Sequence, residues 1–127
     1  MKKASILLFL LASIALTKKV TAQTDPNLQA ILLVNDSLFT NKPLDSIISI
    51  LPTGYISMKI RSGGHYHTAK FLRILYSNKV WIELYVEDFN FMNPVDSNRN
   101  WNLTLMRKEN LDRVSVYQGT TCYRGCN

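Results

Sequence analysis

The 127-residue sequence contains only two cysteines, two histidines, five glycines and four prolines. So little glycine and proline excludes a collagen-like or low-complexity chain, and a hydrophobic content of 46% excludes a wholly disordered one. With so few cysteines and histidines, the chain has little material for zinc sites or nucleophilic catalysis. The composition and length are those of one packed globular domain.

The first 22 residues have the organisation of a secretory signal. A basic start is followed by a largely apolar run from Ala4 to Leu16, and small or modest side chains precede Gln23 at the expected cleavage site. Residues 17–19 interrupt the run too early for a spanning helix, which needs about 20 apolar residues. We expect residues 1–22 to be a signal peptide and the protein to be exported, either to the periplasm or outside the cell. An uncleaved anchor is the alternative, and the only membrane contact we foresee.

Removal of this segment takes away most of the positive charge. The whole chain has a formal charge of +6, but four of its 15 Lys and Arg residues lie in the first 22 residues. The remainder has eleven basic and nine acidic residues, a net charge of +2. Binding to nucleic acid needs a clustered basic face, which a net charge this small does not indicate. We therefore expect no nucleic-acid partner.

Cys122 and Cys126 are the only cysteines and lie close to the C-terminus. An oxidising compartment favours a disulfide between them, and Gly125 lets so small a loop turn. Closing a five-residue loop stabilises the chain by about 2 kcal/mol. Thiol redox chemistry and pairing between molecules are the alternatives. We expect residues 23–119 to form a single domain and residues 120–127 to form a tail closed by the disulfide.

Two short helices are predicted before residue 55. Asp25 and Pro26 are a favourable N-cap and first helical residue. A second helix is indicated from Leu44 to Leu51, where apolar residues recur at helical spacing, and residues 52–54 end it.

After Gly54 the hydrophobic period changes to two. Ile56, Met58 and Ile60 alternate with polar residues, which predicts a strand with these three side chains facing the core. Residues 68–76 and 80–89 are rich in aromatic and β-branched residues and predict two more strands.

The C-terminal part of the chain gives a mixed pattern. Residues 101–112 fit neither period cleanly, so a strand and a short helix both remain open there. Residues 113–117 alternate again, which predicts a final strand with Val114 and Val116 facing inward.

The loop at residues 77–79 decides which faces of the central hairpin are buried. A two-residue turn would place Arg73 among apolar side chains, where an unpaired charge is costly. A three-residue loop places Arg73 opposite Glu83 and leaves one face largely apolar. We predict the three-residue loop and an α+β fold, with one or two N-terminal helices packed on an antiparallel sheet of about four strands.

The other face of this hairpin carries large aromatic and charged side chains. They are Phe71, Arg73, Trp81, Glu83 and Tyr85. Aromatic residues and Arg give a large contact area at little entropic cost, which suits a protein partner or a flat ligand. The alternative is that Trp101, Phe91 or the C-terminal segment covers this face and makes it a second small core.

His65 and His67 are weak candidates for metal ligands. Residues two apart in an extended segment project to the same side, and Glu87 is a possible third ligand in the predicted register. The pattern lacks the further ligands that make zinc sites specific, so we expect no metal and no cofactor.

No catalytic residue is assigned from the sequence. Glu83 and Glu87 would stand about 13 Å apart along one strand, too far for a glycosidase pair. No Ser-His-Asp order and no phosphate-binding loop stands out.

Three short segments carry a resemblance to other proteins. They are Val20-Thr-Ala-Gln23 at the end of the leader, Asn41-Lys-Pro-Leu44 at the start of the second helix, and Arg107-Lys-Glu-Asn-Leu111 before the last strand. In these segments the chain resembles small exported hypothetical proteins of Bacteroidota, which have no assigned activity. The resemblance implies export and carries over no functional residues.

These observations favour an exported interaction module that binds a protein or a small ligand non-covalently through the aromatic face. A small metal-dependent or hydrolytic enzyme and an immunity or inhibitor protein are the alternatives, so the sequence leaves open whether the protein is an enzyme.

Overall fold

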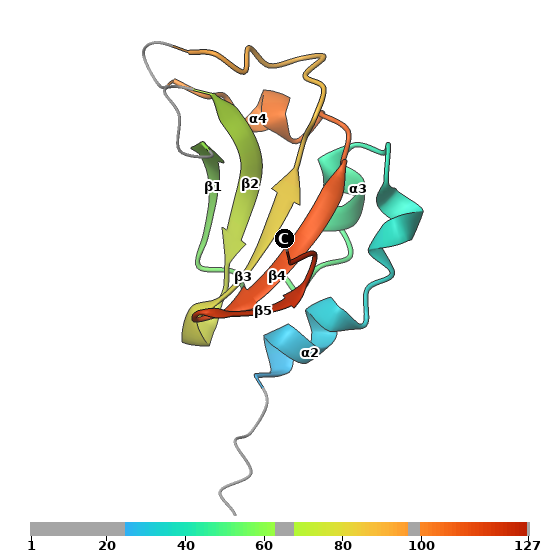
Figure 1. Ribbon diagram of the computed structural model, residues 1–127, viewed down its shortest axis with the longest axis vertical. Helices are drawn as coiled ribbons and strands as arrows, with labels where there is room; N and C mark the ends of the chain where they lie inside the picture. Colours follow the sequence, from blue (N-terminus) through green and yellow to red (C-terminus); the bar gives the residue numbers. More distant parts are fainter. Residues whose placement is uncertain (1–24, 63–67, 97–99, 127) are drawn as a thin grey trace, which may run out of the picture.

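The computed structural model describes residues 25–62, 68–96 and 100–126. It contains an antiparallel sheet with the strand order β1-β2-β3-β4-β5, so each strand pairs with its neighbours in sequence (Figure 1). The strands are β1 (Ser57–Ser62), β2 (Ala69–Leu75), β3 (Val80–Tyr85), β4 (Arg113–Gln118) and β5 (Thr121–Arg124). The expected signal peptide, residues 1–22, lies outside the described residues. Within the described ranges, no helix is long and apolar enough to cross a membrane.

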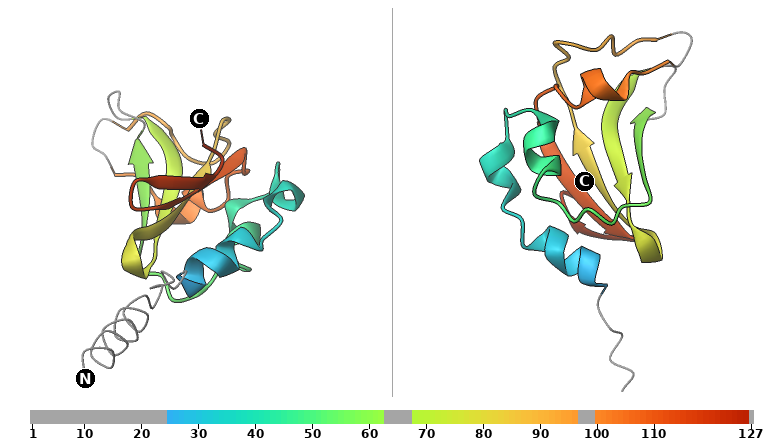
Figure 2. Two further views of the ribbon diagram at one scale, coloured as in Figure 1. Left: turned by 60° about the horizontal axis from the view of Figure 1, so that its bottom comes forward. Right: turned by 180° about the vertical axis from the view of Figure 1, so that it is seen from behind.

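Short helices lie on one side of this sheet, as the view from behind in Figure 2 shows for α3 (Leu44–Ile48) and α4 (Leu103–Met106). The α+β class is therefore confirmed, with five strands rather than about four. The additional strand is β5, which lies in the segment expected to be a tail. Residues 101–112, for which the sequence pattern allows either a strand or a short helix, contain the short helix α4.

The first helix, α2 (Pro26–Leu32), begins where the sequence predicts. The Asp25 carboxylate accepts hydrogen bonds from the backbone N–H groups of Asn27 and Leu28, which satisfies two free donors at the start of the helix. Leu28 and Ile31 lie on one face of α2 and are fully buried. The helix therefore contributes a narrow apolar stripe to the core.

The second helix, α3, is shorter than predicted and ends at Ile48, although Leu51 beyond it is still buried. Its first N–H groups have no side-chain cap. Leu44 N–H and Asp45 N–H instead donate to the carbonyl oxygens of Glu109 and Arg107, at 2.8 and 3.0 Å. Two of the segments that carry the resemblance, 41–44 and 107–111, thus lie side by side and stabilise each other through the backbone.

The central hairpin has the predicted register. Leu72 lies opposite Leu84, and Arg73 lies opposite Glu83. The connecting loop is the three-residue η2 (Ser77–Lys79), closed by the Tyr76 N–H donating to the Val80 carbonyl at 2.7 Å. Lys79 adopts a left-handed conformation with φ of 59°, as the last residue of such a loop does.

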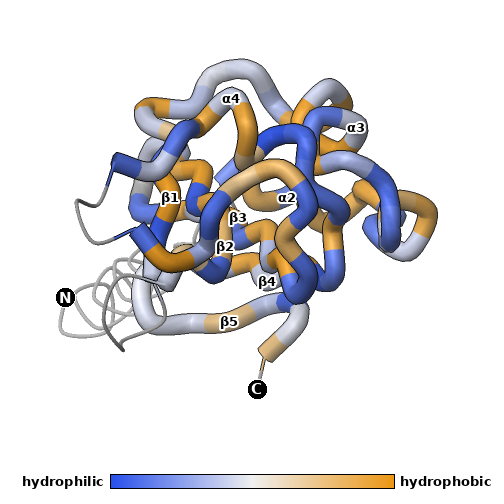
Figure 3. The backbone as a smooth tube through the Cα atoms, turned by 90° about the horizontal axis from the view of Figure 1, so that it is seen from above, coloured by the Kyte–Doolittle hydropathy of each residue, from blue (hydrophilic) through white to orange (hydrophobic). Residues whose placement is uncertain are grey.

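The core lies between the helices and the inner face of the sheet. Apolar and polar residues alternate along β1 and β4, and the buried apolar residues of the sheet pack against α2, α3 and α4; Figure 3 colours the chain by hydropathy. Val114 and Val116 are buried as predicted, and Met58 and Ile60 pack against the core. Ile56 is an exception, because its side chain is 68% exposed. It precedes β1, so the predicted alternation begins one residue too early.

Candidate ligand-binding face

The outer face of the sheet, which points away from α3 and α4, brings together all five residues predicted for binding. Cross-strand pairing places Phe71 beside Tyr85, and Arg73 beside Glu83. Phe71 and Glu83 are buried, with 7% and 4% exposure, whereas Arg73, Trp81 and Tyr85 are half-buried. The face is therefore an ordered layer of side chains that is open to solvent in part.

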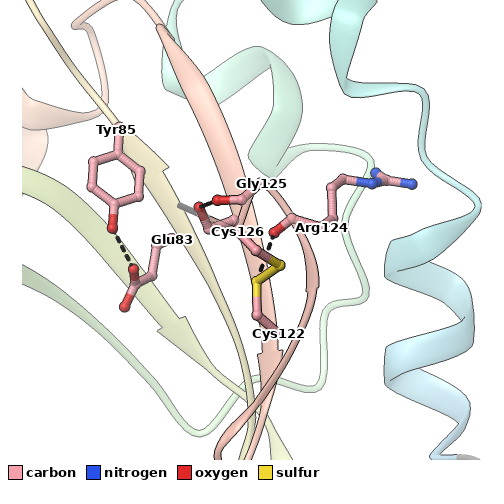
Figure 4. Close-up of a disulfide and its surroundings, with 7 residues drawn as sticks. Glu83, Tyr85, Cys122, Arg124, Gly125 and Cys126 are labelled. Atoms are coloured by element: carbon pink, nitrogen blue, oxygen red, sulfur yellow. Dashed lines mark hydrogen bonds between the residues drawn. A yellow bond between two sulfur atoms is a disulfide. The ribbon is translucent and has the colours of Figure 1, made fainter.

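The carboxylate of Glu83 organises this layer. Its Oε1 accepts hydrogen bonds from Arg73 Nη2 at 2.6 Å, Arg73 Nε at 3.0 Å and Trp81 Nε1 at 3.2 Å. Its Oε2 accepts the hydroxyl of Tyr85 at 2.7 Å (Figure 4). Four donors satisfy a buried charge that would otherwise be costly, and they fix the orientation of three large side chains.

Ring contacts extend this order across the sheet. The guanidinium of Arg73 lies 5.5 Å from the ring centre of Phe71 and 5.4 Å from that of Trp81. Trp81 stacks on Tyr117 of β4 with their ring centres 5.3 Å apart. These cation–π and stacking contacts make the aromatic side chains a rigid surface rather than a mobile one.

Tyr85 has a raised pKa of about 12. Burial is the main cause, because removal from water disfavours the phenolate, and the hydrogen bond and negative charge of Glu83 act in the same direction. Tyr85 therefore stays protonated and acts as a donor to Glu83 over the ordinary pH range.

A cavity of about 420 Å³ opens on this face between β1 and the β4–β5 turn. Its walls combine four basic side chains with two large apolar ones. The lining residues are Ser57, Lys59, Arg61, Arg73, Leu75, Lys79, Trp81, Gly119 and Thr120. A cavity of this size is within the range of small-molecule sites, about 300–1,000 Å³.

The C-terminal disulfide loop covers another part of the outer face. Cys122 and Cys126 form the predicted disulfide (Figure 4). Ser115, the cross-strand partner of Glu83, is fully buried and donates its hydroxyl to the Gly125 carbonyl at 2.8 Å. A Cβ on Gly125 would lie 2.0 Å from the Val114 carbonyl oxygen, so only glycine fits. The C-terminal segment therefore covers the part of the outer face around Ser115, as the alternative interpretation predicted. The cavity beside Trp81 remains open.

Lys59, Arg61 and Lys79 are site residues that sequence reasoning missed. The alternation of residues 57–61 shows Lys59 and Arg61 on the polar side of the first strand, but this side looks like an ordinary solvated face. Only the pairing of β1 with β2 places Lys59 opposite Arg73 and so next to the aromatic layer.

The metal hypothesis gains no support. His65 and His67 lie outside the described residues. Glu87 is exposed and lines a hollow of about 200 Å³ with Asp88 and Asp112. Among the residues that the structure describes, no group of three His, Cys, Asp or Glu side chains is placed to hold a metal ion.

Glu109 is a second buried carboxylate, fully excluded from solvent. It accepts backbone N–H groups from Asn90, Phe91 and Met92 at 2.6–2.8 Å. Within the described ranges, no Lys, Arg or His side chain forms an ion pair with Glu109. Its role is to hold the 90–92 loop against the segment that borders α3.

No protein-family model matches this chain, and no curated protein or solved structure matches it significantly. The outer face is therefore interpreted from its own geometry.

Proposed function

We propose that the protein is an exported, non-covalent binding module whose outer sheet face, at the cavity beside Trp81, receives the ligand. The observation that carries the proposal is the combination of a cavity of ligand size with side chains already fixed by the Glu83 network. A preorganised surface loses little side-chain entropy on binding, which favours affinity.

Export is part of this proposal. The leader-like residues 1–22 support it, and so does the Cys122–Cys126 disulfide, because disulfides persist in oxidising compartments. The full chain should be expressed in a bacterium, and the cell fractions should be examined by mass spectrometry. We expect a periplasmic or secreted protein that begins at Gln23, whereas full-length protein in the cytoplasm would contradict export.

The binding role is tested by amide NMR of the isotope-labelled chain from Gln23 onward. A set of neutral, cationic and anionic aromatic fragments should shift amides of β1, β2, β3 and the β4–β5 turn. Trp81→Ala should abolish these shifts, and Tyr123→Ala should not, because Tyr123 is an exposed aromatic residue that does not line the cavity. If no fragment of any charge binds this face, or if all bind elsewhere, the proposed function is wrong.

A further inference from the structure

We infer that the cavity beside Trp81 takes a small organic anion with an apolar body, such as an aromatic or aliphatic carboxylate. This inference rests on the proposed function and adds the chemical class of the ligand. It follows from three independent features of the cavity: its charge, its apolar wall and the backbone conformation of one lining residue.

The first feature is an excess of positive charge. Four of the nine lining residues are Lys or Arg, and no carboxylate lines the cavity among the described residues. Arg73 is neutralised by Glu83, but Lys59, Arg61 and Lys79 form no ion pair with any residue that the structure describes. A low-polarity concave surface with charge of one sign concentrates ligands of the opposite sign.

The cross-strand pairing strengthens this point. Lys59 lies directly opposite Arg73 in the β1–β2 ladder. Like charges in this position repel and destabilise a sheet. Glu83 offsets the charge of Arg73, but no carboxylate among the described residues pairs with Lys59, so a bound anion beside Lys59 would offset the remaining positive charge.

The second feature is an apolar wall. Leu75 and Trp81 are cross-strand partners and both line the cavity. Tyr117 stacks on Trp81 from the β4 side and supports its indole ring. An inorganic anion would leave this apolar surface unused, whereas a ligand with an apolar body would bury it.

The third feature is the conformation of Lys79. This residue has φ of 59°, where Gly or Asn is more favourable than a long side chain. A lysine at such a position costs stability, which is the kind of local compromise found at functional sites. Its charge at the rim of the cavity provides a reason for the compromise.

The experiment is isothermal titration of the disulfide-bonded chain from Gln23 onward with four probes. Naphthalene-2-carboxylate and octanoate are carboxylates with a flat and a flexible apolar body. The ammonium compound 2-naphthylmethylammonium keeps the ring and reverses the charge, and inorganic phosphate keeps the charge without the apolar body. We expect binding of one or both carboxylates, at least tenfold tighter than either of the other probes, with affinity falling as salt is added.

Charge variants then locate the site. The double variant Lys59→Gln/Lys79→Gln should weaken carboxylate binding about tenfold, because two attractive charges at a partly exposed site are lost. Lys108→Gln is the matched control: this exposed lysine lines none of the cavities described above, and its loss should leave affinity unchanged. Circular dichroism checks that each variant is folded.

Three results would overturn the inference. The first is binding of the ammonium probe as tight as that of both carboxylates. The second is no carboxylate binding at all. The third is carboxylate binding that Lys59→Gln/Lys79→Gln does not weaken. If the NMR fragments still bind the outer face in any of these cases, the proposed function stands and only the anionic class of ligand is wrong.

Discussion

Glu83 and Glu109 are both buried carboxylates, but they are satisfied in different ways. Glu109 is held by three backbone N–H groups of one loop, whereas Glu83 is held by the side chains of Arg73, Trp81 and Tyr85. Backbone donors are fixed by the fold, so Glu109 serves to close a loop. Side-chain donors present their other surfaces to solvent, so Glu83 serves to order a face on which a ligand can bind.

The largest effect is expected for Glu109→Ala. The substitution leaves three backbone N–H groups without their acceptor in a buried place, and we expect the free energy of unfolding to fall by about 3 kcal/mol. Urea denaturation measures it. Glu109→Gln keeps one acceptor oxygen, so its free energy of unfolding should fall by less. A loss below about 1 kcal/mol for Glu109→Ala would show that water replaces the carboxylate and that the loop does not depend on it.

The disulfide loop beside Glu83 has no counterpart beside Glu109. Cys122→Ser/Cys126→Ser opens a five-residue loop and should lower the free energy of unfolding by about 2 kcal/mol. Gly125 and Ser115 should then lose their close packing, which amide hydrogen exchange at β5 would detect. Unchanged exchange at β5 would mean that the strand pairing alone holds the C-terminal segment.

Glu83→Gln should have a smaller effect on stability and an effect on binding that Glu109→Gln lacks. We expect the free energy of unfolding to fall by about 1 kcal/mol, because the Arg73 side chain is 35% exposed and water can solvate it once the ion pair is lost. Freed of its partner, Arg73 adds a positive charge to the cavity, so binding of naphthalene-2-carboxylate should tighten severalfold. Weaker binding in Glu83→Gln would indicate that fixing Trp81 matters more than the charge of Arg73.

The smallest expected effect is on how steeply the Tm falls between pH 10 and pH 12. Tyr85 on the outer face and Tyr76 in the core both have pKa values raised from 10.0 to about 12, chiefly by burial. A raised pKa means that the folded state favours the protonated phenol, so its contribution to stability is present below pH 10 and is lost as pH rises toward 12. Tyr85→Phe and Tyr76→Phe should each make the fall of Tm between pH 10 and 12 less steep. Parallel curves for the wild-type protein and both variants would contradict this assignment.

Much of the sheet could be predicted from the sequence because a strand repeats every two residues. A shift of one residue would bury Arg73, so the pattern around residues 72–84 permits only one register, and the structure has it. The end of α3 and the start of β1 were less predictable, because Leu51 is buried without being helical and Ile56 is apolar without being buried.

The candidate site could be predicted only in part. Phe71, Arg73, Trp81, Glu83 and Tyr85 share a face by alternation alone, so their proximity follows from two strands and one loop. The role of Glu109 has no local pattern, since its partners are backbone groups 17–19 residues earlier in the chain. Hydrophobic periodicity is a local signal and does not predict which loop packs on a given side chain.

The sequence by itself determined the alternation of the strands, the N-cap of α2 and the composition of each sheet face, because these depend on neighbours a few residues apart. Only the tertiary structure decided that β1 brings Lys59 opposite Arg73, that the disulfide loop covers Ser115, and that a cavity remains open between β1 and the β4–β5 turn. Such features depend on the packing of segments far apart in the chain. The shape of a cavity, for example, depends on every side chain that lines it, and these side chains come from several strands and loops.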